Sequence, residues 1–167
     1  YLLSSSVLRG QDGAIDEHAM SDPVRQVLNP IWNSWYFLCL YGGIDQTTGT
    51  ARTDQAGVLD RYLLAKTASL VTEVTARLSS YDLAGATTAV TGFLDALTNW
   101  YVRRSRDRFW SGDDRDAFDT LYTVLETVTK VAAPLIPLIG EEIWQGLTGG
   151  RSVHLEDWPD PDLFPAD

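Results

Sequence analysis

Residues 99–110 hold the densest group of side chains that could do chemistry in this 167-residue sequence. The segment reads NWYVRRSRDRFW, and four of the six positions from 103 to 108 are arginine. In a helix, residues spaced by steps of three and four share one face. The residues of one such face are Asn99, Arg103, Arg106 and Trp110. Trp100, Arg104 and Arg108 form the adjacent row.

The side chains of this segment suit contact with RNA. A guanidinium group offers planar, paired N–H donors to phosphate oxygens, and an indole ring gives a flat surface on which an unpaired base can stack. Alternatively, some of the arginines pair with the many carboxylates of the chain and lie along the surface of the fold. Spacing leaves both interpretations open, and it does not decide whether Trp110 or its neighbour Phe109 points inward.

No other segment carries a recognisable catalytic or metal-binding pattern. His18 and His154 are the only histidines, and neither has a cysteine or a second histidine at metal-ligand spacing. A serine nucleophile elbow, a phosphate-binding glycine loop and a redox cysteine pair are also absent from the sequence. We therefore expect this chain to contain no catalytic residue, metal site or cofactor. Cys39, in the apolar run 35–40, is expected to be a reduced thiol in the core of a cytoplasmic protein.

Charge is the property that fits RNA binding least well. The formal net charge is −10, whereas nucleic-acid binders usually have a basic surface. Only the local field at a contact face matters for association, so the placement of the 13 basic residues decides more than their number. With 44% hydrophobic and 22% charged residues, the chain has the composition of a single globular domain. It contains no apolar run long enough to cross a membrane and no secretory leader.

The elements expected to position the arginine segment are helices. Four stretches have the 3.6-residue period of amphipathic helices, and almost no part of the sequence alternates as a strand does. They are residues 22–41, 55–79, 83–110 and a stretch that begins near Asp114 and carries its apolar residues to Leu135. A shorter helix is expected at 138–147. The fold class is therefore all-α, a bundle of four main helices plus a short C-terminal helix, followed by an irregular Pro- and Asp-rich end.

Capping and breaking residues set the expected ends of the first two helices. Ser21 or Asp22 should cap the first helix, and Gly42-Gly43 should stop it. Pro30 should kink it, because the ring removes one backbone donor and crowds the preceding turn. Thr53 or Asp54 should cap the second helix.

The later helices have equally clear signals. The third helix should begin after Asp82 and end at Ser111-Gly112-Asp113. In the fourth, apolar residues recur at steps of three and four, which is the stripe of a bundle helix. The members of this stripe are Phe118, Leu121, Leu125, Val128, Ala132 and Leu135.

Residues 99–110 resemble a signature of the isoleucyl-tRNA synthetases. Three further segments resemble the same enzymes and stand in the same order: YLLSSSVLRG at 1–10, APLIPLIGEEIW at 133–144 and VHLEDWP at 153–159. The second of these is common to the isoleucyl, valyl and leucyl enzymes. The departures are mild, since Ser6 stands where the family often has proline and Gln11 where glycine is frequent.

The resemblance implies a division of the chain and a role for each part. Residues 1–20 would connect from a catalytic domain, 21–150 would form the helical anticodon-binding domain, and 151–167 would lead irregularly to a further C-terminal region. The parent enzyme would join isoleucine to tRNA(Ile) with ATP and magnesium, as a monomer in the cytoplasm. The His-Ile-Gly-His and Lys-Met-Ser-Lys-Ser motifs of that enzyme are absent. The chain is therefore expected to be a fragment that binds tRNA and is inactive alone.

Other readings remain open at this stage. The valyl or leucyl enzyme is an alternative within the same family. A helical protein-interaction module would use the exposed tryptophan and arginine side chains as hot spots for a partner. A free-standing enzyme is the weakest alternative, because no acid, base and nucleophile converge.

Overall fold

The computed structural model describes residues 21–45, 49–55, 57–112 and 114–165. The expectations for residues 1–20, including the connector, the resemblance at 1–10 and His18, lie outside the described residues. Helices dominate the described part of the chain and no strand occurs in it, so the all-α prediction is confirmed.

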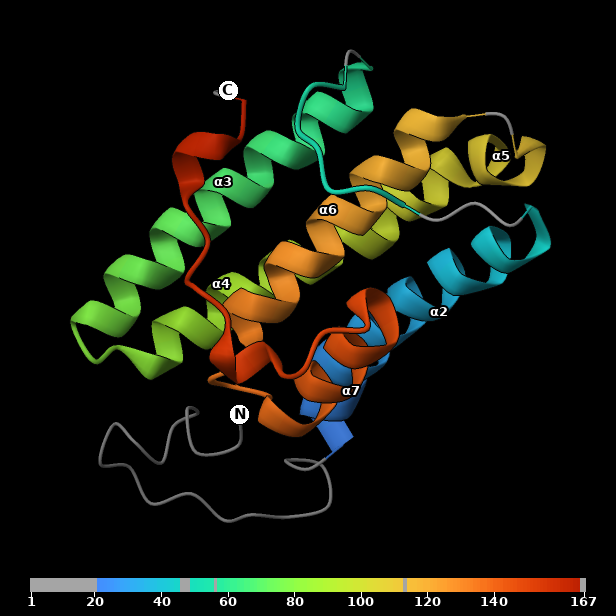
Figure 1. Ribbon diagram of the computed structural model, residues 1–167. Coiled ribbons are helices and arrows are strands. Elements are labelled where there is room, and N and C mark those ends of the chain that lie inside the picture. The colour runs from blue at the N-terminus through green and yellow to red at the C-terminus, as the bar shows by residue number, and fades with distance from the viewer. Residues whose placement is uncertain (1–20, 46–48, 56, 113, 166–167) are drawn as a thin grey trace.

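The elements follow one another with short connections. They are η3 (Val24–Leu28), α2 (Asn29–Asp45), α3 (Val58–Ser79), α4 (Leu83–Asp95), η4 (Ala96–Val102), α5 (Arg103–Ser111), α6 (Arg115–Ala132), α7 (Pro137–Thr148), η5 (Val153–Leu155) and η6 (Pro161–Leu163). η3 and η4 are π-helical, whereas η5 and η6 are single 3₁₀ turns. α6 runs through the middle of the bundle, where it contacts α2, α3, α5 and α7 (Figure 1).

The central helix α6 forms as its apolar period predicts. Asp114 caps it by accepting a hydrogen bond from the Ala117 amide at 3.1 Å. Every member of the predicted stripe is buried, and Phe118 and Leu121 are fully enclosed. Burying such side chains contributes about 1.5–3 kcal/mol each, which makes this helix the main hydrophobic anchor of the bundle.

The first helix differs from its prediction at its caps and in its interior. Ser21 and Asp22, one of which was predicted to cap the helix, are themselves helical, so that prediction is wrong. A π-helical turn, η3, lies directly before the α-helix that contains Pro30, where an α-helical hydrogen bond cannot be completed. α2 also continues to Asp45, so the predicted stop at Gly42-Gly43 is wrong. Glycine inside a helix costs only about 1 kcal/mol, and neither of these glycines adopts a positive φ.

The second helix begins later than predicted, at Val58 after Gly57, so neither Thr53 nor Asp54 caps it. The preceding segment is held in an extended path by α6. The amide of Thr50 donates to Asp119 at 2.8 Å, and the amide of Arg52 donates to Thr123 at 2.9 Å. These bonds hold residues 50 and 52 against α6, and residues 51–55 are not helical.

The third predicted helix is one continuous helical stretch made of α4, η4 and α5. The Asp82 carboxylate caps it by accepting from the Gly85 amide at 2.9 Å. It ends at Ser111, where Gly112 adopts the left-handed conformation with φ 73°. Residues 99–110 therefore lie on a helix, as predicted, with 99–102 in the π-helical turn η4 and 103–110 in α5.

Cys39 is exposed, so the prediction of a core thiol is wrong. Apolar residues surround it on both sides in the sequence, and such a run gives no periodicity from which to choose the inward face. The neighbouring Leu38 and Phe37 take the inward positions. Partial burial nevertheless raises the pKa of the Cys39 thiol.

The C-terminal segment returns along the bundle after α7 and crosses α3 (Figure 1). The indole of Trp158 donates to the Thr75 hydroxyl at 2.8 Å, and Phe164 packs against the core. Its only regular structure among the described residues is the pair of turns η5 and η6.

Candidate nucleic-acid interface

The predicted contact residues lie along η4 and α5, and most of them face solvent. Those exposed are Asn99, Arg103, Arg104, Arg106 and Trp110. The Asn99 amide donates to the Asp95 carboxylate at 2.7 Å. Within the part of the chain that the structure describes, Arg103, Arg104 and Arg106 have no carboxylate at ion-pair distance, so their N–H donors are available to a ligand.

Trp110 points outward and Phe109 points inward. The Trp110 side chain is 79% exposed and has an edge contact with Tyr41, with ring centroids 6.4 Å apart. Phe109 is fully buried, and its ring lies 4.9 Å from those of Phe37 and Phe118. An indole that contacts the protein at one edge and is otherwise exposed to solvent is suited to stacking on an unpaired base.

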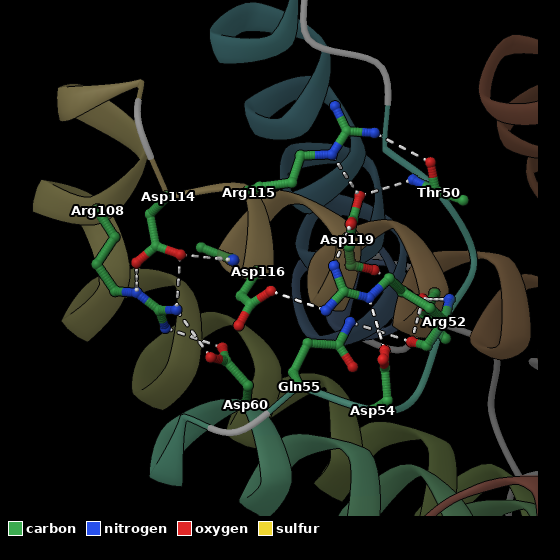
Figure 2. A network of polar contacts seen from close by, with 12 residues as sticks. Thr50, Arg52, Asp54, Gln55, Asp60, Arg108, Asp114, Arg115, Asp116 and Asp119 are labelled. Atoms are coloured by element: carbon green, nitrogen blue, oxygen red, sulfur yellow. Dashed lines mark hydrogen bonds and ion pairs between the residues drawn. The ribbon is translucent and has the colours of Figure 1, made fainter.

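Arg108 differs from the other three arginines because its guanidinium is already engaged inside the bundle. It donates to both carboxylate oxygens of Asp60, at 2.8 and 2.7 Å, and to Asp114 at 2.6 Å (Figure 2). The hydroxyl of Tyr101 donates to the same Asp60 carboxylate at 2.6 Å. The ion-pair interpretation considered for the sequence thus describes Arg108, although it was predicted to contact tRNA.

Hydrogen bonds, charges and burial within this cluster shift the pKa values of Arg108, Asp114 and Tyr101. Asp60 has no exposed side-chain surface, and its hydrogen bond to Arg108 raises the pKa of the guanidinium further above neutrality. Arg108 in turn lowers the pKa of Asp114. Burial raises the pKa of the Tyr101 hydroxyl, and the charge of Asp60 adds to that shift. At neutral pH the cluster is therefore a fully paired internal network.

A row of two adjacent rings with a cation at each end, which we term the cation–ring strip, was not predicted from the sequence. Its members are Lys66, Tyr62, Trp100 and Arg104. The Lys66 ammonium lies 5.6 Å from the Tyr62 ring centroid, the two ring centroids are 4.9 Å apart, and the Arg104 guanidinium lies 4.5 Å from the Trp100 centroid. The four-residue spacing of Tyr62 and Lys66 was visible in the sequence, but their contact with Trp100 depends on how α3 packs beside η4.

The cations that lack a carboxylate partner gather on two elements. Within the described ranges they are Arg61, Lys66, Arg103, Arg104, Arg106 and Arg151. All but Arg151 lie on the first half of α3 or on α5. Asp107 is an exposed acid among them, so this region is positive but not uniformly so. Elsewhere, Arg52 pairs with three aspartates and Arg115 with one of the same three (Figure 2).

No group of three or more His, Cys, Asp or Glu side chains among the described residues could hold a metal ion. No helix in the described ranges is long and apolar enough to cross a membrane.

A helical bundle with unpaired arginines and an open indole along one helix has the character of an RNA-binding domain. The comparisons with known proteins define the class more closely. A family model described as the anticodon-binding domain of tRNA ligase matches residues 60–166. The chain belongs to this family.

The relatives match the whole chain. An isoleucine–tRNA ligase of Leifsonia xyli is 56% identical, one of Nocardia farcinica 55% and one of Mycobacterium tuberculosis 53%, each over 100% of this chain. The resemblance to isoleucyl-tRNA synthetases is thereby confirmed. The chain spans only 15–16% of the length of these relatives.

Proposed function

We propose that this chain is the domain that binds the anticodon arm of tRNA(Ile) in an isoleucine–tRNA ligase. In this proposal residues 21–150 are the tRNA-binding domain, with residues 1–20 leading from a catalytic domain and 151–167 leading to a further C-terminal region. The whole protein would join isoleucine to tRNA(Ile) with ATP and magnesium, both bound outside this chain. By the same resemblance we expect it to act as a monomer in the cytoplasm.

The observation that carries the proposal is the unpaired state of the arginines on α5. The chain has 23 acidic residues, yet none of those described forms an ion pair with Arg103 or Arg106. An exposed guanidinium without a carboxylate keeps its planar set of donors for phosphate oxygens. Trp110 shares their face of the helix, so backbone contact and base stacking can occur side by side.

The direct test is a binding titration of the chain with tRNA(Ile), compared with an unrelated tRNA. Replacing both Arg103 and Arg106 by Ala should weaken binding and reduce the log–log salt slope by about one unit for each lost phosphate contact. The melting temperature should hardly change, because exposed side chains without partners contribute little to stability. Arg151→Ala is the matched control, since Arg151 is exposed and also lacks an ion pair in the described structure.

The outcome separates RNA binding from the alternative of a protein-interaction module. An apolar protein contact would respond only weakly to salt, whereas a contact through phosphates depends on it strongly. A double variant that binds tRNA(Ile) as well as the wild type would overturn the assignment of these arginines. The same substitutions in the full-length enzyme should raise KM for tRNA while leaving isoleucine-dependent ATP–pyrophosphate exchange unchanged.

A further inference from the structure

The cation–ring strip joins two elements that are far apart in the sequence. Tyr62 and Lys66 lie on α3, whereas Trp100 lies on η4 and Arg104 on the first turn of α5. The two rings contact each other, and each ring also has one cation over it. Tyr62 is 36% and Trp100 38% exposed, so the strip lies at the surface.

We propose that the strip is a second RNA contact, which binds an unpaired stretch of the tRNA. A base stacks on the outer face of the Arg104 guanidinium, and Lys66 binds a backbone phosphate. This inference rests on the proposed tRNA-binding function and identifies the part of the RNA that this surface binds. It is distinct from the backbone contacts assigned to Arg103 and Arg106.

The two cations of the strip are not neutralised by a carboxylate in the described structure. Neither Lys66 nor Arg104 has a carboxylate partner among the described residues, and each is held only by a ring. Lys130 shows the contrasting arrangement, because it lies 5.0 Å from the Trp144 ring and also pairs with Glu126 at 3.1 Å. In a chain with 23 acids, a cation fixed over a ring without an acid retains its charge for a ligand.

The Arg104 guanidinium carbon lies 4.5 Å from the Trp100 ring centroid, and the residue is exposed, so it remains accessible to a ligand while in contact with the ring. RNA-binding proteins stack unpaired bases on guanidinium planes as well as on aromatic rings. Bases inside a duplex are already stacked on one another, so this surface selects unpaired nucleotides. The compact ammonium of Lys66 suits a phosphate, for which no planar match is needed.

The strip lies outside the hydrophobic core that joins α3 and η4. Leu63 of α3 and Leu97 of η4 are fully buried members of that core, whereas no strip residue belongs to it. η4 is π-helical over seven residues, a conformation that is rare and often found at functional sites. Consecutive residues of this turn contact two different residues of α3: the Trp100 ring packs against the Tyr62 ring, and the Tyr101 hydroxyl donates to Asp60.

The test replaces Arg104 by Lys, which keeps the charge and removes the plane. Two RNA probes are compared: a hairpin with the anticodon stem-loop sequence of tRNA(Ile), and its stem closed as a duplex without the loop. One stacked base is worth about 5- to 150-fold in affinity. Arg104→Lys should therefore weaken hairpin binding within that range, leave duplex binding unchanged and leave the salt slope unchanged. Arg151→Lys, at an exposed arginine outside the strip, should change neither affinity.

A second variant tests the phosphate contact independently. Lys66→Gln should reduce the salt slope for the hairpin by about one unit and leave the slope for the duplex unchanged. Circular dichroism and melting temperature show whether each variant is folded. If Arg104→Lys melts far below the wild type, Lys66→Gln decides the question alone.

The results distinguish this inference from the proposed function. Equal loss on both probes would make Arg104 a stem-phosphate contact and overturn the inference. Wild-type affinity of Arg104→Lys for the hairpin, with weakened binding when Arg103 and Arg106 are replaced, would also overturn the inference while supporting the proposed function. A wild-type chain that binds neither RNA would overturn both.

Discussion

Replacing Arg108 by Met should destabilise the bundle without affecting RNA binding, although Arg108 lies in the same segment as the proposed contact residues. The Asp60 side chain has no exposed surface, and the substitution leaves its carboxylate without the paired cation. Its remaining partner is the hydroxyl of Tyr101. Methionine retains much of the apolar stem, so the loss reports the ion pair rather than a large cavity.

The expected magnitude follows from the burial of the partners. Removing one member of a buried ion pair costs about 3–5 kcal/mol. Because the Arg108 side chain is 25% exposed, we take the lower end, about 3 kcal/mol. For a chain of this size, that loss corresponds to a fall in melting temperature of roughly 6–12 °C.

The assay is thermal and urea unfolding, with Arg106→Met as the matched control on the same helix. Arg106 is exposed and lacks an ion pair in the described structure, so the control should change the unfolding free energy by less than about 0.5 kcal/mol. Adding Asp60→Asn to Arg108→Met should recover about half of the loss, because the unpaired buried charge is removed. Below its melting temperature, the Arg108→Met protein should bind tRNA(Ile) like the wild type. A wild-type melting temperature combined with a reduced salt slope would refute this reasoning.

Three further predictions concern single positions. Phe109→Ala should lower the unfolding free energy, measured in urea, by about 3–5 kcal/mol. Trp110→Ala should lower it only slightly, because that side chain is 79% exposed. Equal losses for the two variants would contradict the assigned orientations. Arg108 lowers the folded-state pKa of Asp114, so the stabilisation by this carboxylate is present above about pH 4 and is lost as the pH falls through the folded-state pKa. The difference in unfolding free energy between wild type and Asp114→Asn should therefore narrow below pH 4, and a constant difference would be inconsistent with that shift. Cys39 is exposed, and partial burial raises the pKa of its thiol, so iodoacetamide should alkylate the native protein faster as the pH rises through the alkaline range. A thiol that reacts only in denaturant would argue against this placement.

The sequence was most informative where a pattern repeats over several turns. The apolar stripe of α6 and the caps at Asp82 and Asp114 are local signals, and the structure confirms them. The end of the first helix was harder to predict, because Gly42-Gly43 can end a helix but can also lie inside one. At Cys39 the surrounding residues are all apolar, so their order could not identify the face that packs inward.

The role of Arg108 depends on contacts that no local pattern contains. Asp60 lies 48 residues earlier in the chain, and the pair forms only when α3 packs beside α5. The segment before α3 also depends on tertiary contacts, because Asp119 and Thr123 of α6 accept hydrogen bonds from its backbone. The ring contact between Tyr62 and Trp100 is likewise tertiary. Each of these features could be predicted only with the packing of the helices in hand.

The distribution of ion pairs explains how a chain of net charge −10 can present a surface for RNA. The two most buried aspartates that pair with arginine, Asp60 and Asp119, are compensated inside the fold by Arg108, Arg52 and Arg115. The guanidinium groups of those arginines are therefore engaged by carboxylates of the fold itself. The cations left without acids lie mainly on α3 and α5, next to two exposed tryptophans. At physiological ionic strength the Debye length is about 8 Å, so distant exposed acids are largely screened while a phosphate in contact with α5 still interacts with nearby guanidinium groups. Net charge therefore reduces long-range attraction of RNA to this domain, but the pairing pattern determines the affinity at the contact face.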